Sequence, residues 1–186
     1  MPHALRRHEE RTQGATDIEA TEARIALAIK ALKQIKPRIE QRHENWMAAK
    51  SDAVQFWADF AEPQRLLDPD EIPKKEESGA YDRLYAGKVQ LANQAQEAFT
   101  SLTREELGQC LSALDVIRES SVRLFDVRMA IALAQAKADI AMAIEQARHP
   151  ACWQVMHGYI NTAIGELDVY GRGIPAAKNL LRSPNP

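Results

Sequence analysis

The chain has 186 residues with a formal net charge of −2, and 45% of them are hydrophobic and 27% charged. A single domain of this size buries about 70% of the surface that its unfolded chain exposes, so it needs no disulfide or metal for stability. The small net charge argues against a protein whose whole surface binds a polyanion. No run reaches the roughly 18 apolar residues that span a bilayer. The basic start of the chain is followed by no apolar core, so we expect a cytoplasmic protein without a secretory signal.

The composition favours helices throughout. Alanine dominates the apolar residues, and long stretches consist of Ala, Glu, Gln, Lys, Arg and Leu, which lose little side-chain entropy in a helix. Strand-like alternation is absent from the sequence. We therefore predict an all-α, elongated helical bundle of two long helices, about 16–62 and 103–149, and two shorter ones, with coiled-coil-like packing.

Residues 1–15 are polar and aperiodic and predict a flexible N-terminal arm. Thr16 with Glu19 forms a capping box that opens the first long helix. Its apolar stripe repeats every seven residues: Ile18, Ile25, Leu32, Ile39, Trp46, Ala53 and Phe60. Pro37 lies inside this run without changing its phase, which predicts a kink rather than a break, and Pro63 ends the helix.

A loop over 63–80 follows, rich in proline and acidic residues, and then a helix of about 20 residues from Tyr81 to Phe99. Thr103 with Glu106 repeats the capping box and is expected to open the second long helix, which ends at Pro150. Its predicted apolar face consists of Leu107, Cys110, Leu114, Ile117, Leu124, Ile131, Ala138 and Ile140. A last helix covers about 151–170 and is broken by Gly171, Gly173 and Pro175, so residues 16–175 form one domain and 176–186 a short turn and tail.

The helix lengths predict an incompletely covered surface. Helices of about 45 residues reach nearly 70 Å, whereas helices of about 20 residues reach only 30 Å. Unless the short helices lie end to end, part of the first long stripe stays exposed, and such apolar patches usually mark interfaces. We expect the aromatic half of that helix to bind a second copy or another helical protein through Trp46, Phe56, Trp57 and Phe60.

Metal and cofactor chemistry has little support in the sequence. Glu40 and His43 have the E-x-x-H spacing of di-iron bundles, but a second such motif is missing. Cys110 and Cys152 are interpreted as free thiols. We therefore expect no metal and no cofactor.

Arg38 and His43 are the candidate catalytic residues. Their spacing resembles the R-x4-6-H motif of the HEPN ribonucleases, which are all-α dimers. The resemblance covers this one spacing. It implies RNA cleavage by Arg38 and His43 across a dimer interface.

A basic segment lies near the middle of the first long helix. Its cations are Lys30, Lys33, Lys36, Arg38 and Arg42, and Trp46 lies one turn beyond them. Cations at this density are able to neutralise phosphates. The segment predicts either a solvated helix face or a nucleic-acid contact.

Three functions are therefore compatible with the sequence. The first is a non-enzymatic interaction or scaffold subunit that acts through self-association or a protein partner. The second is a helical subunit of a nucleic-acid-handling complex that uses residues 30–42. The third is a HEPN-like ribonuclease, and the absence of other catalytic motifs favours a protein that is not an enzyme.

Overall fold

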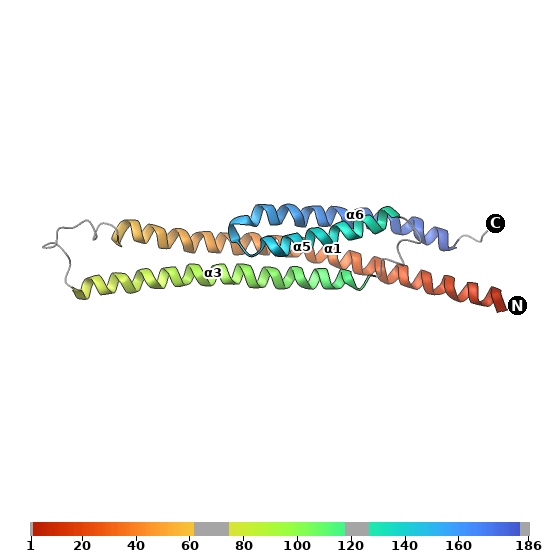
Figure 1. Cartoon of the computed structure of the whole chain (residues 1–186), viewed down its shortest axis with the longest axis horizontal. Helices are drawn as coiled ribbons and strands as arrows, with labels where there is room; N and C mark the ends of the chain where they lie inside the picture. Colours follow the sequence, from red (N-terminus) through yellow and green to blue (C-terminus); the bar gives the residue numbers. More distant parts are fainter. Residues whose placement is uncertain (1, 62–74, 118–126, 183–186) are drawn as a thin grey trace.

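Two antiparallel helical hairpins of unequal length form the structure (Figure 1). The computed structural model describes residues 2–61, 75–117 and 127–182, with side chains described within 18–60, 79–117 and 127–179. The first hairpin pairs α1 (Pro2–Phe56), continued by the π-helical turn η1 (Trp57–Ala61), with α3 (Lys75–Asp115). The second pairs α5 (Val127–Gln146) with α6 (Trp153–Arg182) through the 3-10 turn η3 (Pro150–Cys152). The described part is 96% helical without strands, which confirms the predicted all-α helical bundle.

The second hairpin covers only part of the first. α6 contacts α1 and α5 contacts α3, so these four helices close into a bundle around one core. Figure 1 shows that α1 and α3 continue together well past η3, where the second hairpin ends. The described residues therefore form a four-helix section and, at one end, a section of two helices.

The seven-residue stripe of α1 supplies its side of the core. Ile25, Leu32 and Ile39 are 2%, 0% and 1% exposed, and the stripe stays buried as far as Ala53. The other helices contribute a set of fully buried side chains: Phe99, Leu107, Leu114, Leu133, Ile140, Met156, Ile160 and Leu167. The prediction for α1 is confirmed over this range because a regular heptad pattern keeps one helix face directed at its neighbours.

The predicted second long helix over 103–149 is wrong. Thr103 and Glu106 lie inside α3 and not at a helix start. α3 is a single helix that begins at Lys75 and also includes the predicted helix from Tyr81 to Phe99. α3 ends at Asp115, where the backbone N–H of Ile117 donates to the carbonyl of Leu114 at 3.0 Å in a tight turn. The chain direction reverses between α3 and α5, because α5 buries its apolar side against α3 and α6. The sequence between Asp115 and Val127 contains no Gly or Pro that would indicate this reversal.

The reversal also changes which residues of α5 are buried. Ile131 and Ala138, predicted to continue the apolar face, are exposed, and Ile131 retains 62% of its accessible surface. Leu133 and Ala136 face the core instead, each at 0% exposure, and Ile140 is buried as predicted. The heptad phase of α3 therefore does not continue into α5.

Three predicted helix ends are also corrected. The backbone is helical from Pro2 instead of irregular over 1–15. At Pro37 no correction is needed, because α1 continues through it without a break, as predicted. Residues 75–80 belong to α3, while 62–74 of the predicted loop lie outside the described residues. α6 continues through Pro175 to Arg182 because the burial of its apolar face outweighs the local helix-breaking signals. Gly173 has a packing role there, since a Cβ at this position would lie 2.5 Å from Sδ of Met129 on α5.

Candidate interaction surface

Arg38 and His43, the predicted catalytic pair, take part in different clusters. Nη1 of Arg38 lies 3.1 Å from Oε1 of Glu106 on α3, and Nε of Arg38 donates to the carbonyl of Gln34 at 3.2 Å. The ring of His43 lies 4.9 Å from that of Trp153 on α6. The ion pair compensates the charge of Arg38, and the imidazole packs among aromatic rings.

Burial lowers the pKa of His43 below its ordinary 6.5, although the charge of Glu44 opposes this shift. The neutral imidazole is therefore the favoured form in the folded chain at neutral pH. The ring of His43 also lies 6.4 Å from that of Phe99, so it contacts both α3 and α6.

A polar cluster between α1 and α3 was not predicted. Arg42 donates through Nη1 and Nη2 to the two carboxylate oxygens of Glu106, at 2.9 and 3.0 Å. Nη1 of Arg42 also donates to Oγ1 of Thr103, which is fully buried, at 3.3 Å. The side chains of Arg42 and Glu106 are only 17% and 19% exposed. Thr103 and Glu106, interpreted from the sequence as a capping box, therefore bind an arginine about 60 residues earlier, and no local pattern signals that pairing.

The basic segment is divided between different sides of α1. Arg38 and Arg42 face Glu106 on α3, as described above. Lys30 and Lys33 are exposed, and Lys36 is half-buried. The five cations therefore do not present one uniform surface, and two of them share an internal carboxylate.

Glu40, the carboxylate of the E-x-x-H motif, contacts His157 of α6. Its Oε1 lies 3.0 Å from Nε2 of His157, whose ring in turn lies edge-on to Trp153 at 5.9 Å. Glu40 and His43 are thus both directed at the start of α6, and each contacts a different residue there. Within the three described ranges no group of three or more His, Cys, Asp or Glu side chains is arranged to hold a metal ion.

Both cysteines are free, as predicted. Cys110 is buried between α1 and α3, and burial raises its pKa above the ordinary 9.0; Glu106 adds to this shift and Arg38 opposes it. Such a thiol stays protonated at neutral pH and packs as a small apolar side chain. Cys152 is half-buried in η3.

The predicted interface aromatics mainly join α1 and η1 to α3. Trp46 is 8% exposed and therefore buried within the chain. The ring of Trp57 lies 5.2 Å from that of Tyr85, and the ring of Phe60 lies 6.2 Å from that of Tyr81 in a stacked arrangement. Phe60 nevertheless keeps 47% of its surface exposed, so among the four predicted interface aromatics it is the most accessible to a partner.

Apolar side chains are exposed on the two-helix section, which we call the distal arm and define as residues 47–60 and 79–91. Glu40 and His43 mark the side of α1 that faces α6. Met47 and Val54 follow His43 at i+4 and i+11, which is the spacing of one helix face. They are 46% and 59% exposed, since α6 begins only at Trp153 beside His43. Among the described residues no helix covers this side of the arm.

The opposite helix of the distal arm also exposes apolar groups. Leu84 and Leu91 of α3 are 57% and 58% exposed and stand seven residues apart, on one side of the helix. The described helices lie lengthwise in an elongated molecule, which leaves long lateral faces of this kind (Figure 1).

The described helices include no segment that is long and apolar enough to cross a bilayer. No family model, curated protein or solved structure matches the chain.

Proposed function

We propose that this chain is a non-enzymatic interaction subunit whose distal arm binds a helical protein partner. The observation that carries the proposal is that the α6-facing side of α1 continues beyond the start of α6 with Met47 and Val54 exposed. Two packed helices offer a groove to a third, and a partner helix would cover these residues as α6 covers the preceding turns.

Aromatic and ionic contacts between α1 and α3 in the distal arm support this interpretation, because they hold the two helices together before a partner binds. Lys88 of α3 lies 2.6 Å from Asp52 of α1, and its ammonium is 5.5 Å from the ring centre of Phe56. Together with the Trp57–Tyr85 contact, these interactions hold α1 against α3 in the section that the second hairpin does not reach. A partner therefore meets an ordered surface and loses little conformational entropy in the arm on binding.

Substitution of one exposed residue tests the proposal. Val54→Glu places a charge on the uncovered side, whereas Leu27→Glu introduces the same charge at a similarly exposed apolar position of α1 outside the arm, 65% exposed against 59%. We expect proteins captured from the native host by the wild type to be captured by Leu27→Glu as well, and to be lost with Val54→Glu. Equal capture by both variants would contradict the role of the arm.

The two other functions remain hypotheses with separate tests. Nucleic-acid binding through residues 30–42 requires affinity that falls steeply with salt. The division of the cations between exposed positions and Glu106 makes that segment a poor continuous track for phosphates. Ribonuclease activity would require RNA cleavage that is lost in His43→Ala.

A further inference from the structure

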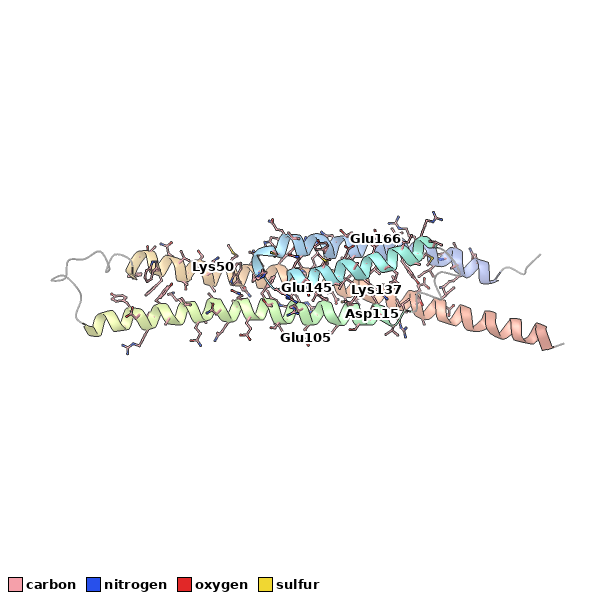
Figure 2. The ribbon with its side chains drawn as sticks, in the orientation of Figure 1. Lys50, Glu105, Asp115, Lys137, Glu145 and Glu166 are labelled. Atoms are coloured by element: carbon pink, nitrogen blue, oxygen red, sulfur yellow. The ribbon has the colours of Figure 1, made fainter. Side chains whose placement is uncertain are left out.

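The outward side of α5 is an apolar stripe. α5 contains four charged residues, Arg128, Lys137, Asp139 and Glu145. Two of them do not charge the outward side, because Lys137 pairs with Asp115 of α3 at 3.3 Å (Figure 2) and Asp139 is 5% exposed. The stripe itself consists of Val127, Ile131, Ala134, Ala138 and Met142, all exposed, with Val127 at 64%, Ile131 at 62% and Met142 at 43%.

These five residues follow one another at spacings of four, three, four and four, so they lie on one side of the helix over about 22 Å. The large side chains of Ile131 and Met142 stand toward the ends, and the two alanines lie between them. Arg128 and Glu145 are exposed beside the two ends of the stripe and have opposite charges. Read from either end, the stripe gives nearly the same order of charge, large apolar residue, small residue, small residue, large apolar residue and charge.

α6 widens this surface. Gly173 faces α5, because a Cβ added to it would lie 2.5 Å from Sδ of Met129. Val169 and Val155 precede Gly173 by four and eighteen residues, that is by about one and five helical turns, so they lie on the α5 side of α6. They are 48% and 53% exposed and therefore form the outer rim beside α5.

We propose that α5 packs antiparallel against α5 of a second copy of this chain, around a two-fold axis near residues 135–138. In this register Ile131 meets the partner's Met142, Ala134 meets the partner's Ala138, and Arg128 approaches the partner's Glu145. The alanines allow the two helix axes to approach closely, and the larger residues on either side fill the space as the helices diverge.

A second copy fits this surface better than an unrelated helix because the pattern is self-complementary. An isologous interface requires each residue to meet the residue at the mirrored position of the same surface. The antiparallel arrangement satisfies this for both the apolar residues and the end charges, whereas a parallel one would place Arg128 beside the partner's Arg128. Glu145 already pairs with Arg148 of its own chain, whose Nη2 lies 3.0 Å from one carboxylate oxygen and 3.1 Å from the other. Each carboxylate oxygen has a second lone pair, so Glu145 is still able to accept a further cation.

The size of the surface indicates a weak dimer. Two adjacent helices over about 22 Å bury on the order of 500 Å² per copy, or about 1,000 Å² in total, which is at the lower limit for specific interfaces. We therefore expect a dissociation constant of roughly micromolar order. The proposal is independent of the partner proposed for the distal arm, which lies on other residues.

Sedimentation equilibrium of the full chain between about 1 and 100 µM tests the proposal. We expect a monomer–dimer equilibrium in the wild type, unchanged in Leu27→Glu and in Val54→Glu. Ala138→Glu should weaken dimerisation at least tenfold with the helical circular dichroism signal preserved, because Ala138 is exposed in the folded chain. A wild type that stays monomeric at 100 µM, or a dimer insensitive to Ala138→Glu, would overturn it. Loss of the dimer in Val54→Glu alone would instead assign self-association to the distal arm.

Charge reversal tests the register. Arg128→Glu and Glu145→Arg should each weaken the dimer several-fold, because each places like charges opposite one another at both ends of the two-fold interface. The variant that carries both reversals should recover the wild-type dissociation constant. If the double variant is no tighter than the single ones, the antiparallel register is wrong.

Discussion

Removing Glu106 should destabilise the bundle more than removing an exposed ion-pair partner elsewhere. Glu106 accepts two hydrogen bonds from Arg42 and lies 3.1 Å from Nη1 of Arg38, so Glu106→Leu leaves two guanidinium groups without this carboxylate. Loss of one partner costs about 3–5 kcal/mol in a fully buried pair and less than about 1 kcal/mol at the surface. With 17% and 19% of the side chains of Arg42 and Glu106 exposed, we expect a loss of about 2 kcal/mol.

A double-mutant cycle isolates the contribution of the pair. The free energy of unfolding in urea is measured for the wild type, Arg42→Leu, Glu106→Leu and the double variant. The double variant should lose about 1–2 kcal/mol less than the sum of the single variants, because neither buried charge is then left without the other. Asp52→Ala serves as the control, since Asp52 is 59% exposed in its pair with Lys88 and its removal should cost less than about 1 kcal/mol. Additive losses within about 0.5 kcal/mol would refute the argument that burial makes this pair structurally important.

The remaining predictions concern the helices themselves. Pro37→Ala should raise the melting temperature, because it restores a backbone hydrogen bond inside the continuous α1, worth up to about 3 kcal/mol; a lower melting temperature would contradict this. Gly173→Ala should be less stable than Gly165→Ala in urea, because the added Cβ meets Met129 in the first case and open space in the second, where Ala gains up to about 1 kcal/mol; equal stabilities would refute the close contact. His43→Phe should reduce the loss of stability on acidification. The folded-state pKa of His43 lies below 6.5, so protonation favours the unfolded chain as the pH falls from about 6.5 toward that lower value. The free energies of unfolding of the wild type and the variant, measured at about pH 7.5 and pH 5.5, test this, and an equal loss in both proteins would contradict it.

The sequence predicted the elements whose signal is local and regular. The helical class follows from composition, and the buried side of α1 from a seven-residue repeat that places Ile25, Leu32 and Ile39 on one face. The expectation that part of α1 would stay uncovered rested on helix lengths that were wrong, since α3 has 41 residues and α6 has 30. Met47 and Val54 are nevertheless exposed, whereas Trp46 is buried.

Tertiary structure decided the features that depend on residues far apart in the chain. No residue near Asp115 signals that α3 ends there, and the reversal occurs because α5 buries Leu133 and Ile140 only by folding back onto the bundle. The same reversal turns Ile131 outward, which a continuous heptad could not foresee. Glu106 likewise has the local pattern of a helix cap, yet its partner Arg42 is brought to it by the α1–α3 hairpin, since a long-range ion pair leaves no trace in either local sequence.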